Sequence, residues 1–243
     1  TTLFRSPTKS FECLEYTDFV KAAEKLEPII AKAAKQGKAA KIGKLIYDAT
    51  NVEKNINFGI SMMMIPLAAS HGKSTKGILK SLTPADTKWI VRAMQRGKLG
   101  GMGLKDKSLA KYDIYSKDIF RVIKEEKITP LKLMEMAKPY DTLAKEWIED
   151  FPITRVIGRR IEKDPESILH AFLFVLSKYP DTLIARKLGL EEAVKISEMV
   201  RFVLDNKIEL RAFDEYLREK GNKRSPGTTA DLIATGLFLK LLK

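Results

Sequence analysis

The residues most able to do chemistry lie near the end of the chain, in a turn between two apolar stretches. Arg224 begins this turn, Pro226 and Gly227 form its centre, and Asp231 follows. Proline fixes φ and glycine tolerates positive φ, so the pair favours a turn. A helix N-terminus presents unpaired N–H groups to which phosphate binds. The turn is therefore compatible with a phosphate cradle, although spacing alone favours an ordinary loop before a core helix.

A helix is expected after this turn, over about residues 229–242. Thr228 and Thr229 are N-cap candidates, and Asp231 would place a negative charge in the first turn. The segment is apolar almost all round, which is typical of a buried helix. The turn would then lie where a buried helix begins.

A second polar group precedes the methionine-rich stretch 58–69. Asn55 and Asn57 lie just before this stretch, which reads as a central buried helix. Asparagine at a helix start either caps the helix or hydrogen-bonds a ligand hydroxyl. Spacing alone favours capping.

A third polar group contains one carboxylate, Asp181, followed by Arg186 and Lys187. A carboxylate with two cations suits the binding of magnesium and phosphate. An exposed helix with internal salt bridges would have the same pattern. The sequence contains no catalytic triad, no Walker loop and no dinucleotide fingerprint.

Composition narrows the class of partner. The 243 residues include 44 Lys plus Arg and 31 Asp plus Glu, a net charge of +13. Such a balance favours an anionic partner: nucleic acid, a nucleotide or a polyphosphorylated cofactor. The single cysteine, Cys13, excludes internal disulfides and multi-cysteine metal sites. No signal-peptide pattern and no apolar run of about 18 residues is present, so a cytoplasmic protein without a membrane span is expected.

The elements that must position these residues are helices. Three segments begin with an N-cap residue followed by proline, at Thr83, Thr129 and Asp164, and Tyr179 is a fourth candidate. No segment alternates as a strand does, so the fold class is all-α. Helices are expected on both sides of an interruption at Pro28, and over 41–48, 58–69, 130–137, 141–149, 153–162, 165–178, 190–204 and 208–220.

No internal repeat or low-complexity linker divides the chain, which favours a single domain over residues 1–243. The glycine-containing loop 97–113 is the one credible hinge. These observations describe a basic all-α domain with an anionic ligand.

Three of these stretches carry a resemblance to the triphosphoribosyl-dephospho-CoA synthase family, in an archaeal-type form. Residues 225–232 (SPGTTADL) are similar to the family pattern N-P-G-[ST]-[ST]-A-D-L. Residues 181–189, with Asp-Thr at the start, Arg186 and a final glycine, resemble a second family segment. Residues 55–59 (NINFG) resemble its N-x-N-x-G helix start. Residues 100–103 (GGMG) resemble its G-G-x-G loop.

The resemblance covers about residues 50–243. Residues 1–40 diverge from it: relatives begin with a helix and a K-P-G loop, whereas this chain opens with Thr1 and the segment 6–10 (SPTKS). Such a change would affect catalysis if that loop supplies catalytic or metal-binding groups.

The resemblance implies a transferase that uses ATP and 3′-dephospho-CoA. The 2′-hydroxyl of the dephospho-CoA ribose replaces adenine at the anomeric carbon of ATP, through an oxocarbenium-like transition state. It implies Asp181 and Asp231 as carboxylates at that centre or as ligands of an expected Mg²⁺ ion. It also implies nucleotide or phosphate binding by the residues Asn55, Asn57, Arg186, Lys187, Gly227 and Thr228.

Two alternatives remain open at this stage. A protein of the same fold could bind nucleotide but use another acceptor, or lack activity, because its N-terminal region diverges. A basic nucleic-acid-binding protein is favoured only by net charge, since the aromatic interleaving of single-strand binders is absent. The sequence leaves the oligomeric state open.

Overall fold

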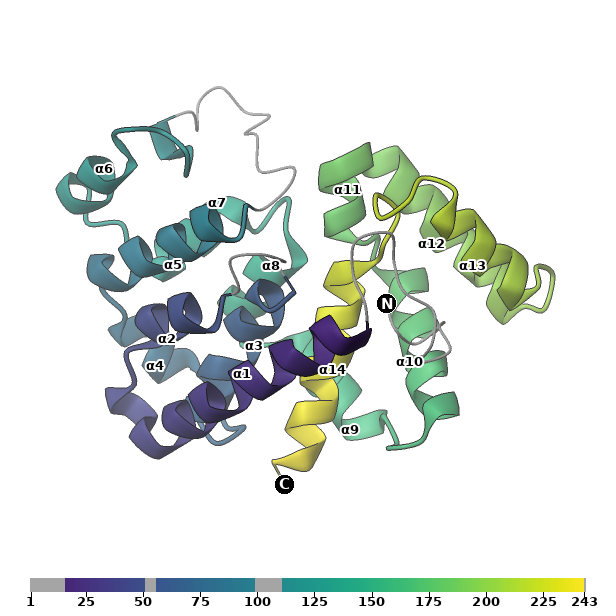
Figure 1. Ribbon diagram of the computed structural model, residues 1–243, viewed down its shortest axis with the longest axis horizontal. Helices are drawn as coiled ribbons and strands as arrows, with labels where there is room; N and C mark the ends of the chain where they lie inside the picture. The colour runs from purple at the N-terminus through teal and green to yellow at the C-terminus, as the bar shows by residue number, and fades with distance from the viewer. Residues whose placement is uncertain (1–15, 51–55, 99–110, 243) are drawn as a thin grey trace. The chain divides into compact units, whose positions relative to one another are not determined.

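The structure, a computed structural model, describes residues 16–50, 56–98 and 111–242 (Figure 1). All regular structure in these ranges is helical, which confirms the predicted all-α class. The helices are α1 (Tyr16–Gln36), the 3-10 turn η1 (Gly37–Ala39), α2 (Ile42–Ala49), α3 (Phe58–Ala69), α4 (Lys76–Ser81), α5 (Pro84–Arg96), α6 (Ile119–Glu125), α7 (Pro130–Ala137), α8 (Thr142–Glu149), α9 (Pro152–Arg160), α10 (Pro165–Lys178), α11 (Thr182–Leu188), α12 (Leu190–Leu204), α13 (Leu210–Arg218) and α14 (Gly227–Leu241).

The chain divides into two compact units. Unit 1 consists of residues 1–19 and 153–241, and unit 2 consists of residues 20–152 and 242–243. Helices α10 to α14 therefore belong to unit 1, and α2 to α8 belong to unit 2. The single domain expected over residues 1–243 stays a prediction.

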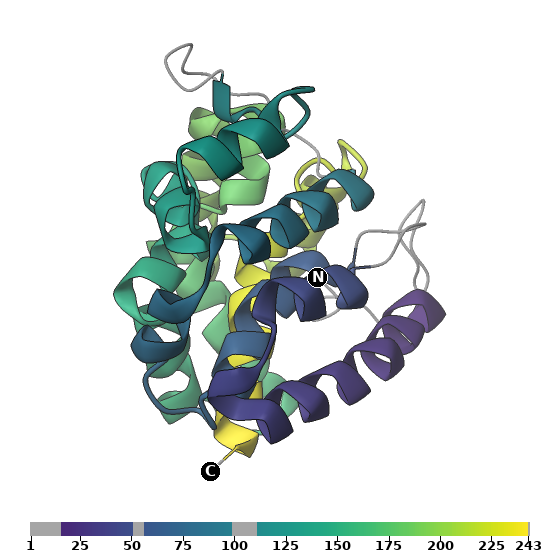
Figure 2. The same cartoon turned by 90° about the vertical axis from the view of Figure 1, so that its left-hand side faces the viewer.

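In unit 2, α2 packs closely along α5, as Figure 2 shows. A Cβ atom on Gly43 would lie 2.4 Å from the backbone oxygen of Asp86, so glycine is required at this contact. Asp86 Oδ1 accepts a hydrogen bond from the Gly43 N–H at 3.3 Å. Its other oxygen, Oδ2, accepts from Thr83 N at 3.0 Å, within the predicted capping box of α5. One aspartate thus caps α5 and fixes the start of α2 against it.

The predicted helix Phe58–Ala69 has the bounds expected, as α3, and most of its residues are buried. Met62 and Met63 contribute to this core as apolar filling. Trp147 of α8 is 1% exposed, and its Nε1–H donates to the Met62 carbonyl oxygen at 2.8 Å. The all-round apolar composition of α3 therefore reflects burial, as predicted.

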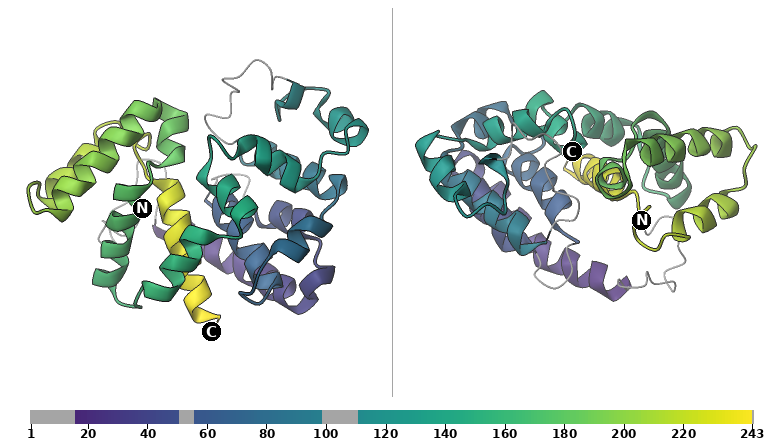
Figure 3. Two further views of the ribbon diagram at one scale, coloured as in Figure 1. Left: turned by 180° about the vertical axis from the view of Figure 1, so that it is seen from behind. Right: turned by 90° about the horizontal axis from the view of Figure 1, so that it is seen from above.

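In unit 1, α14 crosses α9 at a glycine contact. A Cβ on Gly236 would lie 2.3 Å from Ile157 Cγ2, and one on Gly158 would lie 2.9 Å from the Gly236 oxygen. Helix α14 also packs on α10, and Figure 3 shows these two helices side by side. Leu232 is 1% exposed, whereas Leu241 at the end of the helix is 64% exposed. The predicted burial of this helix thus holds for its middle turns and fails at its end.

Three of the four predicted helix starts with proline are confirmed, at Thr83, Thr129 and Asp164. The fourth stretch, residues 179–182, also begins a helix, but not by that pattern: Tyr179 is the C-cap of α10, and the N-cap of α11 is Asp181, after the proline. The carboxylate at position 181 accepts N–H groups of the first turn, which a tyrosine side chain two residues earlier does not do.

The predicted interruption at Pro28 is also wrong, because α1 runs through it without a break. Leu26 and Ala33, on either side, are buried, so packing holds the helix on both sides of the missing N–H. The short helices α4 and α6 were not predicted from periodicity. Of the glycine-containing loop 97–113, residues 99–110 lie outside the described part, and its role as a hinge stays a prediction.

Among the described helices, none taken singly combines the length and apolarity that a membrane crossing needs. Helices α10 and α11 satisfy that criterion as a pair bent by 54°, on length and composition alone.

Candidate functional site

The candidate site in unit 1 is built around Asp181, whose carboxylate joins two helix starts. Asp181 Oδ1 accepts from the N–H groups of Leu183 at 2.9 Å and Ile184 at 3.2 Å, and so caps α11. Asp181 Oδ2 accepts from Thr229 N at 2.8 Å and Thr229 Oγ1 at 2.9 Å, in the first turn of α14. The two motifs that lie 48 residues apart in sequence are thus linked through one carboxylate.

Thr228 and Gly227 complete this junction. Thr228 Oγ1 lies 3.2 Å from Thr182 Oγ1 and accepts from the Leu183 N–H at 3.2 Å. A Cβ on Gly227 would lie 2.6 Å from Leu183 Cδ2, the end of a flexible side chain, so Leu183 would have to move to admit it. The φ of Gly227 is outside the left-handed region, so conformational freedom is not the reason for glycine here.

Helix α14 begins two residues earlier than expected, at Gly227. Thr228 and Thr229 therefore lie inside the first turn and are not its N-cap, which corrects the predicted assignment. Asp231 lies beyond that first turn, so it is not the first-turn acid that was expected. The cap is supplied instead from another helix, by Asp181.

The environment of Asp181 argues against a metal at this residue. A carboxylate has about four lone-pair sites, and four hydrogen bonds occupy those of Asp181. The side chain is 1% exposed, and burial raises its pKa above the ordinary value while the hydrogen bonds from Thr229, Ile184 and Leu183 oppose that rise. Within residues 16–50, 56–98 and 111–242, no three His, Cys, Asp or Glu residues gather as they would around a metal ion held by protein side chains alone. Asp181 thus fits a structural cap and not a Mg²⁺ ligand.

Two cations occupy the last turn of α11, as predicted. Arg186 is half-buried, and Lys187 is exposed with its Nζ donating to the Asn222 carbonyl oxygen at 3.2 Å. The pKa of Lys187 is lowered by desolvation and by the nearby charge of Arg186, and Asp181 opposes this shift. Asp231 is half-buried on α14. These three residues belong to the elements that Asp181 joins, α11 and α14.

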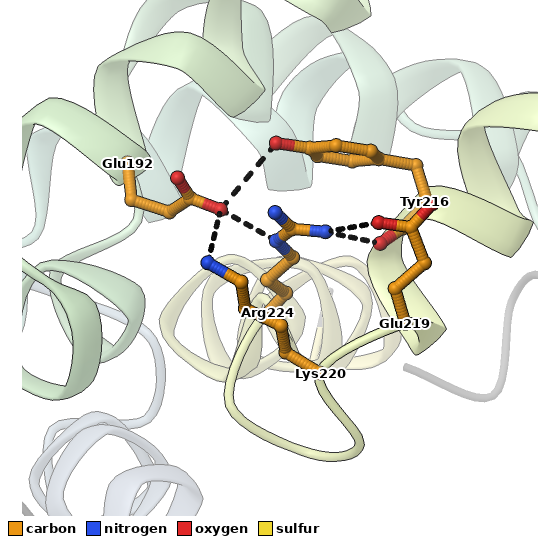
Figure 4. Close-up of polar contacts among 5 residues, drawn as sticks. All are labelled: Glu192, Tyr216, Glu219, Lys220 and Arg224. Atoms are coloured by element: carbon orange, nitrogen blue, oxygen red, sulfur yellow. Dashed lines mark hydrogen bonds and ion pairs between the residues drawn. The ribbon is translucent and has the colours of Figure 1, made fainter.

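Arg224, which was considered as the basic residue of a phosphate cradle, is committed to protein groups (Figure 4). It is 4% exposed, and its Nε donates to Glu192 Oε1 at 2.5 Å. Its Nη1 donates to the carbonyl oxygen of Tyr216 at 2.8 Å and to Glu219 Oε2 at 2.9 Å. The guanidinium centre also lies 3.7 Å from the centroid of the Tyr216 ring. Arg224 therefore ties α12, α13 and the turn before α14 together.

The pKa shifts of Glu192 and Arg224 agree with this ion pairing. The hydrogen bond from Arg224 lowers the pKa of Glu192, and burial opposes that shift. Glu192 Oε1 also accepts from the Tyr216 hydroxyl at 3.4 Å, and Lys220 Nζ lies 3.9 Å away. The pKa of Arg224 is raised although its burial acts to lower it, because Glu192 and Glu219 hydrogen-bond the charged form. The charge of Arg224 is thus balanced locally and does not point to a phosphate.

Asn57 has a structural contact in unit 2. It is 2% exposed, and its Nδ2–H donates to the carbonyl oxygen of Ala22 in α1 at 2.7 Å. It occupies the N-cap position of α3 without a side-chain capping bond, so the capping interpretation is wrong for this residue. Asn55 lies outside the described residues, as does the segment 100–103.

Sequence reasoning missed Glu192 and Glu219 as partners of Arg224. Glu192 lies 32 residues before Arg224, in the first turn of another helix, and no spacing rule connects them. Glu219 lies five residues before Arg224, and a charge so near in sequence was a usable signal. The sequence therefore allowed only part of the hydrogen bonding around Arg224 to be predicted.

The junction of α11 and α14 contains the two family-like stretches 181–189 and 225–232, held together by Asp181. The sequence model of the family described as ATP:dephospho-CoA triphosphoribosyl transferase matches residues 6–243. The chain belongs to this family. The match confirms the resemblance and extends it through most of the region where no motif had been found.

Comparison with solved structures agrees on the fold. A protein of Archaeoglobus fulgidus, whose crystal structure is assigned as that of a triphosphoribosyl-dephospho-CoA synthase, superposes with a TM-score of 0.70 at 23% identity. The similarity covers 91% of this chain and 97% of the other. No functionally curated protein matches the chain. The transferase family and its all-α fold are thus established, and the reaction is the one that the family description names, with ATP and dephospho-CoA as substrates.

Proposed function

We propose that this transferase moves the 5-triphosphoribosyl group of ATP to the 2′-hydroxyl of 3′-dephospho-CoA. The bond between the anomeric carbon and N9 of adenine breaks, and adenine leaves with one proton. A bond forms between the same carbon and the acceptor oxygen, which loses its proton. The family match over residues 6–243 is the observation that carries this proposal.

The reaction places positive charge on the ribosyl ring while the triphosphate stays negative. Cations near the phosphates and a carboxylate near the ring lower the energy of such a transition state. Arg186 and Lys187 supply cations at the end of α11. Phosphate binding at Gly227 and Thr228 stays a prediction, because the N–H groups of Gly227 and Thr229 already donate to the Ser225 carbonyl oxygen and to Asp181 Oδ2. Asp231 supplies a carboxylate that is half-buried rather than enclosed. Arg186, Lys187 and Asp231 are the proposed substrate-binding and catalytic groups of unit 1.

Asp181 is proposed as a positioning residue for this group. Its four hydrogen bonds fix the start of α11 relative to the start of α14, and these helices carry Arg186, Lys187 and Asp231. A role for Asp181 in the chemical step, and ribose binding by Asn55 and Asn57, stay predictions. A cytoplasmic location and an archaeal type of enzyme also stay predictions.

Magnesium is proposed to arrive with the triphosphate of ATP. Mg²⁺ is commonly held by one or two carboxylates together with substrate phosphates and water. Asp181 has no free lone pair for it, which leaves Asp231 as the acidic candidate at this junction. The reaction steps above do not depend on a resident ion.

The test is incubation with ATP, Mg²⁺ and 3′-dephospho-CoA, followed by chromatography for adenine and mass spectrometry for the adduct. Adenine and an acceptor heavier by one triphosphoribosyl unit should form together. Asp231→Asn should lower kcat and kcat/KM together, because it removes a charge and keeps the side-chain shape. Lys187→Gln should chiefly raise KM for ATP. ATP binding with no adenine release would disprove the proposed activity.

A further inference from the structure

Unit 2 carries a group of cations and aromatic rings that none of the assigned motifs includes. Lys44 and Tyr47 lie on α2, and Trp89, Arg92 and Arg96 lie on α5. These five residues are called the cation–aromatic patch. Lys44 and Tyr47 are one helical turn apart, as are Trp89 and Arg92, so each pair shares a helix face.

The rings and cations of the patch are in contact with one another. The ring centroids of Tyr47 and Trp89 are 5.1 Å apart with an interplanar angle of 52°. Arg92 lies 4.9 Å from the Trp89 centroid, and Arg96 lies 4.9 Å from the Tyr47 centroid. Lys44 lies 5.3 Å from the Trp89 centroid. An arginine placed over a ring keeps its N–H edges available for other partners.

The positive charges of the patch exceed the negative ones. Lys44 pairs with Asp48, Nζ to Oδ1, at 2.5 Å. For Arg92 and Arg96, no carboxylate of the described chain lies at ion-pair distance. Lys25 of α1 adds a further positive charge nearby: its pKa is lowered by desolvation and by the charge of Arg96, with Asp48 opposing. Repulsion among these cations is a cost that a bound anion would remove.

Several other arginines of the described chain pair with carboxylates. Arg121 pairs with Asp118 at 3.2 Å and with Glu125 at 3.0 Å. Arg218 pairs with Asp214 at 2.5 Å. The two arginines of the patch differ from these because aromatic rings, and not carboxylates, hold their guanidinium groups.

The patch is also preorganised. The contact of Gly43 with Asp86 fixes α2 against α5 within one turn of Tyr47 and Trp89. Both rings are half-buried, so their positions are held by the packing of the two helices. Groups that are already in place lose little freedom when a ligand binds.

We infer that the cation–aromatic patch is a binding site for the phosphate groups of a nucleotide. Arg92 and Arg96 bind the phosphate oxygens, and Tyr47 and Trp89 hold the two guanidinium groups in position. The inference rests on the proposed function for the identity of the nucleotide, which is ATP or 3′-dephospho-CoA. The phosphate chemistry is common to both.

Trp89 provides a direct measurement. The chain has two tryptophans, Trp89 and Trp147, and Trp147 is 1% exposed in the core of unit 2. Tryptophan fluorescence, excited where adenine does not absorb, is followed at low salt during titration with pyrophosphate, ATP or 3′-dephospho-CoA. A saturable change is expected with pyrophosphate and with at least one nucleotide, and Trp89→Phe should abolish it.

Arg92→Gln and Arg96→Gln should each weaken the binding of the responding nucleotide about tenfold, the usual effect of losing a charge-assisted hydrogen bond. Arg121→Gln is the matched control, because it removes the same charge from an arginine of unit 2 that pairs with carboxylates. The dissociation constant of this variant should change less than about twofold, because the charge of Arg121 is exposed and already paired with carboxylates. The nucleotide that loses affinity in both arginine variants identifies the source of the phosphate.

Three results would overturn the inference. The first is a Trp89 signal that responds to neither pyrophosphate nor nucleotide in the folded protein. The second is equal weakening by Arg121→Gln, which would indicate net charge alone. The third is a response only to a single-stranded RNA, which would make the patch a nucleic-acid surface. A Trp89 response without adenine release would instead refute the proposed activity and leave the phosphate site standing.

Discussion

Two arrangements of arginine, one found in each unit of this protein, can be compared. In unit 1, Arg224 is 4% exposed and donates to both Glu192 and Glu219. In unit 2, Arg92 and Arg96 lie over aromatic rings, and no carboxylate among the described residues pairs with either. The first arrangement neutralises its charge within the protein, whereas the second leaves the charge available to a ligand.

This difference shows why a net charge of +13 says little about where an anion binds. Arg224 lies in the signature turn and was the obvious basic residue of a cradle, yet its donors are used by the protein. Arg92 and Arg96 lie in no motif, yet no carboxylate of residues 16–50, 56–98 and 111–242 pairs with them, and an anionic ligand could take that place. The pairing of each cation, and not its position in a motif, separates structural from ligand-binding charge.

The largest effect is expected from Arg224→Ala. It removes the partner of Glu192, whose side chain is 17% exposed, and it frees the turn before α14. Breaking a buried pair costs roughly 3 to 5 kcal/mol, and the lower end applies here because Glu219 is 62% exposed and can be hydrated. Urea unfolding followed by circular dichroism measures this loss.

Two variants make the comparison specific. Arg224→Lys keeps the charge but lacks the planar fork, so it should recover only part of the lost stability. Arg121→Ala removes an arginine whose side chain is 59% exposed and should change stability by about 0.5 kcal/mol or less. If Arg224→Ala were as mild as Arg121→Ala, the structural role of Arg224 would be wrong.

The second effect concerns the link between α11 and α14. Asp181→Ala leaves buried N–H groups without their acceptor, and loss of such a cap costs about 2 kcal/mol. Asp181→Asn keeps one acceptor oxygen but presents an amide donor to a neighbouring donor, so it should also destabilise the fold. Thermal unfolding is measured beside kcat per folded molecule. A normal melting temperature with strongly reduced kcat would show that Asp181 acts in the chemical step.

Much of this fold could be predicted because its signals are local. The bounds of α3 are predicted by an apolar run. The starts of α7 and α10 are predicted by an N-cap residue, Thr129 or Asp164, followed by proline. The double role of Asp181 could not be predicted, since Thr229 lies 48 residues away. The type of Gly227 predicts a turn, and it does not reveal that the Leu183 side chain lies against this glycine. Contacts distant in sequence decide these roles, and a single sequence does not contain them.

The third effect concerns the alignment of the cation–aromatic patch. Gly43→Ala places a Cβ 2.4 Å from the Asp86 oxygen, and overpacking of this kind costs roughly 1 to 3 kcal/mol. The displacement of α2 from α5 should also separate Tyr47 from Trp89 and weaken the fluorescence response to pyrophosphate. Gly77→Ala is the control, because no atom lies within 4 Å of its added Cβ. Equal stability of the two variants would contradict the close contact.

The smallest effect is a pH dependence that only the paired arrangement in unit 1 should show. Arg224 lowers the pKa of Glu192 in the folded protein, so this carboxylate binds protons less readily when folded than when unfolded. Its contribution to stability is therefore complete above the unfolded pKa and is lost as the pH falls through the folded pKa. Glu192→Gln should melt below the unaltered protein at neutral pH.

The two melting temperatures should then converge in acid, because a protonated glutamate resembles glutamine. Burial raises the pKa of Asp181, so this residue contributes with the opposite sign. Its contribution to the stability of the protein falls as the pH rises from its unfolded pKa through its folded pKa. That term is present in both proteins and cancels from their difference. Parallel melting curves down to the acid-unfolding range would mean that Arg224 does not stabilise the charged form of Glu192. Convergence of the two melting temperatures would show that the ion pair between Arg224 and Glu192 stabilises the folded protein.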